Sequence, residues 1–302
     1  MRLTRACTLT ASPLRGSPQV KRESLGRFVS SMHVIDLTQD YIRYVIQQDK
    51  PALYEDSLPQ LFEHYYQFWA SRSSYFYKDE SEIWHRNELV RDRLPFLEKK
   101  FSNKGLHLEQ VGVVLFIGQG SSNGHAFLLD GKWTVWLPLE TYSSLFAVDV
   151  FVSHEIAHAL HYQRQPDFFF RNKEEKDNIF RQMITEGIAT ITSQHVLGVD
   201  DKCALWADYL PIEQIEHWYQ ECLLREPEII KIVVENLKES DESLFSYTGS
   251  DDVLENRAGY YVALLLMRRV LKTQKLSVND LFLIGRQKFF EVVKALLENQ
   301  PA

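Results

Sequence analysis

Cysteine is scarce in this sequence: Cys7, Cys203 and Cys222 are the only three, and no two of them form a C-x-x-C pair. Cysteines so few and so scattered exclude the disulfide framework that stabilises many small secreted domains. This usage is typical of a protein from a reducing compartment. We therefore expect a cytoplasmic localisation.

Long hydrophobic runs are also absent. The run from Ala147 to Val152 is interrupted by Asp149, and no run approaches the roughly 20 apolar residues that a helix needs to cross a bilayer. A secretory signal requires a continuous apolar centre near the N-terminus, and residues 1–31 contain none. The sequence therefore predicts no membrane partner.

A net positive charge is found at one end of the chain only. The formal net charge is −7, yet residues 1–31 carry six Arg and Lys against one Glu, a net of +5, which leaves −12 on the remainder. This negative charge on residues 32–302 argues against nucleic acid as the main partner. Residues 1–31 are predicted to be a disordered or non-native extension, with Met32 as a second candidate for the first residue. The alternative is an organelle transit peptide, which the composition of these residues faintly resembles.

The rest of the composition is ordinary for a globular protein, with 45% hydrophobic and 25% charged residues among 302. That length supports one large domain or two closely packed ones. We expect an N-terminal helical region at 32–104 and a catalytic region at 105–302, packed as one compact unit.

Helical periodicity dominates both ends of the chain. Pro51 and Pro59 divide residues 36–72 into two or three helices. Another helix is expected over 80–100, with a break or kink at Pro95. Further helices are predicted at 143–163, 174–197, 203–208, 211–238, 256–273 and 277–298.

A small antiparallel sheet is expected between these helical parts. Residues 111–117 (VGVVLFI) are β-branched and bounded by glycine, which is typical of a buried strand. Residues 125–129 and 132–137 flank Asp130-Gly131, a pair that favours a type I′ hairpin turn. Helices followed by a small sheet and more helices indicate the α+β class.

The helix after the hairpin carries His154-Glu155-Ile156-Ala157-His158, a match to H-E-x-x-H. Positions i and i+4 lie one turn apart on the same face, so both imidazoles can reach one zinc ion. Glu155 lies beside them and can act as general base toward a water. Burying these polar groups in so apolar a helix is costly without a partner.

A working zinc site needs a third protein ligand. His161 continues the same helical face, but it lies about two turns from His154, too far to share an ion. Asp167 follows a Gln-Pro break and could fold back. Glu186 is the best candidate, because it borders an apolar stripe in MITEGIAT, 183–190, where a carboxylate needs a cation or donors. Gly187 beside it is costly in a helix unless something approaches closely.

With H-E-x-x-H followed by a helix reading E-G-I-A, the chain resembles the gluzincin zinc metallopeptidases. More closely, it is similar to bacterial families of predicted zinc-dependent proteases that also have a glycine-rich loop, here 121–124, and a G-Y-Y-type segment, here Ala258 to Tyr261. The resemblance covers roughly residues 105–275 and implies a zincin-like fold. It also implies that His154, His158 and Glu186 are the ligands and Glu155 the base.

Two features depart from the gluzincin pattern. Thermolysin-like enzymes have an Asp four residues after the ligand Glu, and this Asp supports the first His ligand. This chain has Thr190 at that position, so the sequence does not identify a residue that supports His154. The G-x-M-E-N segment of gluzincin aminopeptidases is absent, which weakens an assignment as an aminopeptidase.

The resemblance also implies substrate-binding residues. In gluzincins an edge strand before the active helix pairs with the substrate backbone, so Lys132 to Leu137 is expected to be that strand. The substrate-binding residues expected within it are Trp133, Thr134, Val135 and Trp136. Tyr260 is the expected donor to the oxyanion, with Tyr261 as the second candidate.

The sequence thus predicts a zinc-dependent metallopeptidase, with one Zn²⁺ per chain and a peptide or protein substrate. The reaction is expected to be hydrolysis by a zinc-activated water with Glu155 as general base. Two alternatives stay open: a catalytically inactive zincin-like binding protein, and a zinc hydrolase of a non-peptide substrate. An inactive protein is expected to have lost Glu155 or a ligand, and all four residues are present.

Overall fold

The computed structural model describes residues 31–298. The prediction for residues 1–31 therefore lies outside the described residues, except at Ser31. The strands are β1 (His33–Asp36), β2 (Gly112–Phe116), β3 (His125–Leu129) and β4 (Lys132–Pro138). The longer helices are α3 (Pro59–Phe68), α4 (Glu80–Ser102), α5 (Leu145–Arg164), α7 (Ile179–Leu197), α9 (Ile212–Leu224), α10 (Glu226–Glu235), α11 (Ala258–Gln274) and α13 (Arg286–Glu298). The shorter ones are α1 (Thr38–Tyr41), a π-helix (Ile42–Gln47), α2 (Pro51–Glu55), α6 (Lys173–Asp177), α8 (Asp201–Trp206) and α12 (Val278–Leu281).

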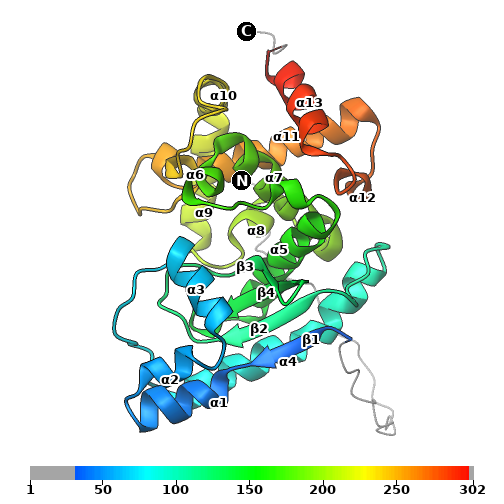
Figure 1. Cartoon of the computed structure of the whole chain (residues 1–302). Helices are drawn as coiled ribbons and strands as arrows, with labels where there is room; N and C mark the ends of the chain where they lie inside the picture. The colour runs from blue at the N-terminus through cyan, green and yellow to red at the C-terminus, as the bar shows by residue number, and fades with distance from the viewer. Residues whose placement is uncertain (1–30, 299–302) are drawn as a thin grey trace, which may run out of the picture.

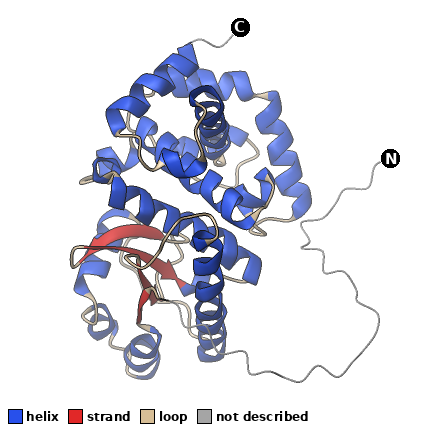
Figure 2. Ribbon diagram, turned by 90° about the vertical axis from the view of Figure 1, so that its right-hand side faces the viewer, coloured by secondary structure: helices blue, strands red, loops and turns tan. Residues whose placement is uncertain are grey.

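The chain is mostly helical with a four-stranded sheet before α5, which confirms the α+β class. Figure 1 shows the sheet and α1–α4 in the lower part of the molecule and α10, α11 and α13 in the upper part, with α5 between them. In Figure 2 the strands again lie in the lower half, with helices above them. None of the helices within residues 31–298 has both the length and the apolar character that a bilayer crossing demands.

The sheet is mixed rather than antiparallel, which corrects the expectation. Its strand order is β1-β2-β4-β3, with β1 parallel to β2, β2 parallel to β4, and only β3 antiparallel to its neighbour. β1 was not predicted, because its four residues carry no recognisable alternation. Helices α1–α4 lie between β1 and β2 in the chain and form the long crossover connection that a parallel pairing requires.

The β3–β4 hairpin matches its prediction. Asp130 and Gly131 have φ angles of 50° and 77°, which are the values of a type I′ turn. This turn sets the register that places His125 opposite Trp136.

Local signals account for several helix boundaries. Pro51 and Pro59 divide the segment into helices, as predicted, and each stands in the first turn of the helix that follows, α2 or α3. The Ser144 side chain caps α5 by accepting from the Ala147 N–H. Asn178 caps α7 in the same way and so separates it from α6. Pro95 lies inside α4 and does not interrupt it, because the helix continues to Ser102.

Residues 32–104 contact the rest of the chain directly. β1 pairs with β2, and Arg93 of α4 forms a 2.6 Å ion pair with Asp149 of α5. The division of the chain at 32–104 and 105–302 stays a prediction.

α7 packs tightly against α11. A Cβ atom at Gly187 would lie 2.7 Å from the Ala263 carbonyl oxygen and 2.8 Å from Met267 Cγ. The glycine therefore allows the neighbouring helix to approach closely, as the sequence suggested. This packing holds the face of α7 that carries Glu186 toward α5.

Candidate metal centre

Three side chains from two helices bring their donor atoms together. His154 and His158 lie one turn apart on α5, and Glu186 comes from α7. Glu186 Oε2 is 3.0 Å from His154 Nε2 and 3.4 Å from His158 Nε2, and the two imidazole nitrogens are 3.2 Å apart. The structure thus places all three predicted ligands in one cluster.

The spacing of these atoms suits a zinc ion. Zinc binds imidazole nitrogen and carboxylate oxygen at about 2.0–2.2 Å in tetrahedral sites, which puts two ligand atoms about 3.3–3.6 Å apart. The observed separations of 3.0 to 3.4 Å are close to these values. Two imidazoles and one carboxylate are also a donor set that catalytic zinc sites use, with the fourth position left open. The residues present therefore fit zinc.

The electrostatics of the cluster keep the carboxylate charged. Burial opposes ionisation of Glu186, but the nearby His158 and His154 outweigh it and hold the pKa of this carboxyl well below its usual range. Burial lowers the pKa of His154 and favours its neutral form. Zinc needs an ionised carboxylate and neutral imidazoles as ligands. Glu186 and His154 therefore favour the forms that a metal would bind.

The Glu155 side chain lies against Gly124, the residue before β3, and borders the same space as Glu186. Gly124, with φ of 144°, leaves the space for it, because a Cβ there would lie 2.8 Å from Glu155 Cγ. Burial raises the pKa of Glu155 to about 8. Its Oε2 has no hydrogen-bond partner among residues 31–298. A buried carboxylate with a free oxygen is suited to exchanging a proton with a water.

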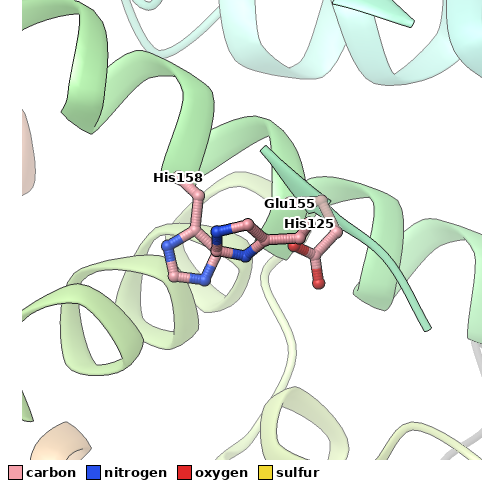
Figure 3. Close-up of side chains that lie close together, drawn as sticks. All are labelled: His125, Glu155 and His158. Atoms are coloured by element: carbon pink, nitrogen blue, oxygen red, sulfur yellow. The ribbon is translucent and has the colours of Figure 1, made fainter. Parts of the chain in front are cut away.

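His125 was not predicted as part of the site, and it lies beside Glu155 and His158 (Figure 3). Donor atoms of these three residues all lie within 4.8 Å of one another. No hydrogen bond or ion pair joins them in the described chain, whereas the His154, His158 and Glu186 atoms lie within 3.4 Å. The tighter cluster is therefore the better metal site, and His125 is part of its wall.

Tyr260 faces this cluster, whereas Tyr261 does not. The Tyr260 ring lies 6.2 Å from the His154 ring, and Tyr260 lines the space around the donor atoms. The Tyr261 hydroxyl instead donates to Glu226 of α10. Burial and the Glu186 carboxylate raise the pKa of Tyr260, so its hydroxyl stays protonated and able to donate.

A family model described as "Predicted Zn-dependent protease (DUF2268)" matches residues 107–291, more than half of the chain. The chain belongs to this family. The matched region contains α5, α7 and α11, the elements that build the cluster. No curated protein matches the chain significantly.

The candidate metal ligands of this family member line a chamber that adjoins a larger cavity. A small chamber of about 60 Å³ borders His154, Glu155, His158 and Glu186. It adjoins a cavity of about 540 Å³, because Glu186, Arg257 and Tyr260 line both. Cavities of this size are typical of sites for small molecules and short peptides.

The glycine-rich loop before β3 forms one wall of the cleft. Gly120 to Asn123 line the cavity. The buried Glu140 carboxylate accepts hydrogen bonds from the Gly118 and Gly120 N–H groups at 3.0 Å. The Tyr65 hydroxyl accepts from the Gln119 N–H at 2.8 Å. These contacts fix the loop that the sequence indicated only by its glycines.

The expectation that Lys132–Leu137 is an edge strand is wrong. β4 pairs with β2 on one side and β3 on the other, so it has no free edge. Of the residues predicted to bind the substrate backbone, Thr134, Val135 and Trp136 are buried and Trp133 is partly buried. None of the four lines the cavity or the chamber.

β3 is the edge strand on the side of β4, but aromatic side chains pack around it. His64 of α3 stacks with Phe127 at 5.4 Å and with Phe169 at 6.2 Å. Phe170 lies 5.4 Å from His125. Ala126 and Phe127 are accordingly buried. The cleft therefore reaches the sheet mainly at His125 and the loop before it.

The other two ligand candidates lie outside the cluster. Asp167 is exposed, in the 3₁₀ turn Pro166–Phe168. His161 is fully buried against Phe168, with ring centroids 4.6 Å apart. It lines neither the chamber nor the cavity.

Proposed function

We propose that this protein is a zinc metallopeptidase of the gluzincin type, with a zincin-like fold and one zinc ion per chain. His154 and His158 of α5 and Glu186 of α7 hold the metal. The observation that carries the proposal is the convergence of these three donor atoms within 3.0 to 3.4 Å. We expect the protein to act on peptides in the cytoplasm, with neither a membrane nor a nucleic acid as partner.

Zinc, when bound, lowers the pKa of a water and polarises a carbonyl group. The chain supplies the proton transfers. Glu155 takes the proton of the attacking water, and the same carboxyl gives it to the amide nitrogen as the C–N bond breaks. Its burial beside His158, with one oxygen unpartnered among the described residues, places it for both steps.

Tyr260 serves the developing negative charge. Its hydroxyl lies on the α11 side of the chamber, opposite the helix that carries Glu155. A protonated phenol there donates a hydrogen bond to the oxyanion, which strengthens as the carbonyl oxygen gains charge.

The proposal is tested by separating metal binding from catalysis. Glu186→Ala is expected to lose most of the zinc and all activity, because it removes a ligand. Glu155→Gln is expected to keep zinc and lose activity, because an amide cannot accept the proton. Asp167→Ala is the matched carboxylate control and is expected to keep both. Zinc is measured in the purified proteins by elemental analysis, and activity by chelator-sensitive cleavage of a peptide library.

Each outcome has a definite meaning. A zinc-replete, active Glu186→Ala protein contradicts the gluzincin ligand set. An active Glu155→Gln protein contradicts the proposed base. A wild-type protein that binds zinc and cleaves no peptide supports instead a binding protein or a hydrolase of another substrate.

A further inference from the structure

Arg257 is the residue of the cleft that the proposed chemistry leaves unused. It lines both the chamber at the donor atoms and the larger cavity. It occupies the N-cap position of α11, three residues before Tyr260, and its side chain makes no capping hydrogen bond. Its positive charge therefore lies close to the position where a peptide bond would be cut.

The Arg257 guanidinium has no anionic partner in the described chain. Lys176, which also lines the cavity, pairs with Asp177 and Glu242. Arg181 donates to the Phe168 and Lys176 carbonyls and to the Tyr162 hydroxyl. Within residues 31–298, no ion pair or side-chain hydrogen bond engages Arg257. Its donors are thus available to a ligand.

Two aromatic rings hold the Arg257 side chain in place. Its Cζ lies 4.3 Å from the centre of the Tyr260 ring and 4.6 Å from that of Trp206. Cation–π contacts of this kind orient a guanidinium without neutralising it, and they leave its N–H edge free. A preorientated fork of donors matches the two oxygens of a carboxylate.

The backbone of Arg257 is also unusual. Its φ is 61° and its ψ 23°, in the left-handed region that glycine and asparagine adopt more easily. An arginine here costs conformational energy, and such costs cluster at functional sites. The conformation directs the side chain between Trp206 and Tyr260, at the wall of the cleft.

We propose that Arg257 binds the C-terminal carboxylate of a peptide substrate, which makes the protein a carboxypeptidase that removes one or two residues. This inference rests on the proposed zinc peptidase function. The Arg257 Cζ lies 4.3 Å from the centre of the Tyr260 ring, and that centre lies 6.2 Å from the centre of the His154 ring. The Arg257 Cζ is therefore at most about 10.5 Å from the centre of the His154 ring. An extended residue spans about 3.3–3.6 Å, so one or two residues fit between the cut bond and the guanidinium.

The shape of the site agrees with a short segment beyond the cut bond. β4 has no free edge and aromatic rings pack around β3, so no open strand is offered to a long substrate. Water adds to the carbonyl carbon, the C–N bond breaks, and the proton goes to the released amine. The products are a shortened peptide with a new carboxylate and a free amino acid or dipeptide.

The first test uses the wild-type protein and needs no substitution. A library of random hexapeptides is prepared as free acids and as C-terminal amides, and the products with zinc-loaded protein are read by mass spectrometry. The acids are expected to lose one or two C-terminal residues, with kcat/KM about 100-fold above that of the amides, because the amide lacks the charge that Arg257 pairs with. Equal cleavage of the two libraries, or cuts throughout the peptides, overturns the inference and leaves the peptidase function intact.

The second test assigns the preference to Arg257. Arg257→Gln is expected to lower kcat/KM for the acids about 100-fold more than for the amides, so that the preference for acids is lost. Arg257→Lys keeps the charge without the planar fork and is expected to fall between. Arg225→Gln is the control, because it removes an equal charge from an ion pair at the surface. A full preference for acids in Arg257→Gln overturns the assignment.

A binding measurement keeps the inference testable without catalysis. Metal-free wild-type protein is titrated by NMR with N-acetyl-Ala-Phe and with its C-terminal amide. Tighter binding of the acid than of the amide, with the difference lost in Arg257→Gln, supports the carboxylate site. If neither library is cleaved but this binding difference is found, only the peptidase function fails. Equal binding of the two compounds contradicts the carboxylate site.

Discussion

Tyr260 and Tyr261 are adjacent in the sequence and have different surroundings. Tyr260 lies between the His154 ring and the Arg257 guanidinium, at the cleft. Tyr261 is buried toward α9 and α10, where its ring meets Tyr219 and its hydroxyl meets Glu226. The two residues therefore form a matched pair for testing which hydroxyl takes part in the reaction.

Tyr260→Phe is expected to lower kcat about 10²–10³-fold with a smaller change in KM, because the lost donor acts on the oxyanion. Tyr261→Phe is expected to leave kcat unchanged and to lower stability by about 1 kcal/mol through its lost hydrogen bond. Steady-state kinetics on one cleaved peptide and chemical denaturation measure the two effects. An unaltered kcat in Tyr260→Phe removes this residue from the mechanism.

At the scale of elements, the site depends on how closely α7 approaches α11. Gly187 is the point of nearest approach, because a side chain there would meet the Ala263 carbonyl and Met267. The residue before it, Glu186, supplies the predicted third ligand. A separation of the two helices would therefore also displace that carboxylate from the histidines of α5.

Gly187→Ala is expected to destabilise the protein by about 1–3 kcal/mol, although alanine favours a helix by about 1 kcal/mol over glycine. The clash is with backbone at 2.7 Å, which cannot rotate away. Gly187→Val is expected to cost more, because the overlap grows with side-chain volume. Denaturant unfolding and zinc content follow both effects. A Gly187→Ala protein more stable than wild type would show that the helices separate easily.

At the scale of the whole molecule, the metal would link α5, which lies against the sheet, to α7, which packs on the C-terminal helices. A ligand that binds only the folded state stabilises it by about 2.7 kcal/mol at 100 times its dissociation constant. For a chain of this size each kcal/mol moves the melting temperature by about 2–4 °C. Metal binding and global stability are therefore expected to change together.

Removal of zinc with a chelator is expected to lower Tm by about 5–10 °C, and added zinc to restore it. Glu155→Gln is expected to show the same shift, because that residue does not hold the metal. Glu186→Ala is expected to melt at one temperature with or without chelator. Differential scanning calorimetry of the three proteins provides the measurement. A wild-type Tm insensitive to zinc argues against a metal bridging the two helices.

The parts of the site that follow from short-range spacing could be predicted from the sequence. The i, i+4 interval puts His154 and His158 on one face of any α-helix. Asp130-Gly131 favours one turn type wherever the hairpin lies. Glu186 was found because a carboxylate beside an apolar stripe needs a partner, and this need is visible in the sequence itself.

Only the tertiary structure decided the rest, because it depends on which distant segments meet. β1 carries no pattern of its own, although it pairs with β2. The parallel pairing of β2 with β4, segments separated by the β3 strand, is what removes β4 from the sheet edge. The choice between Tyr260 and Tyr261 depends on the rotation of α11 against α7, which apolar spacing defines too coarsely. Arg257 has no sequence signature, because its importance lies in its left-handed backbone and in Trp206, 51 positions earlier in the chain.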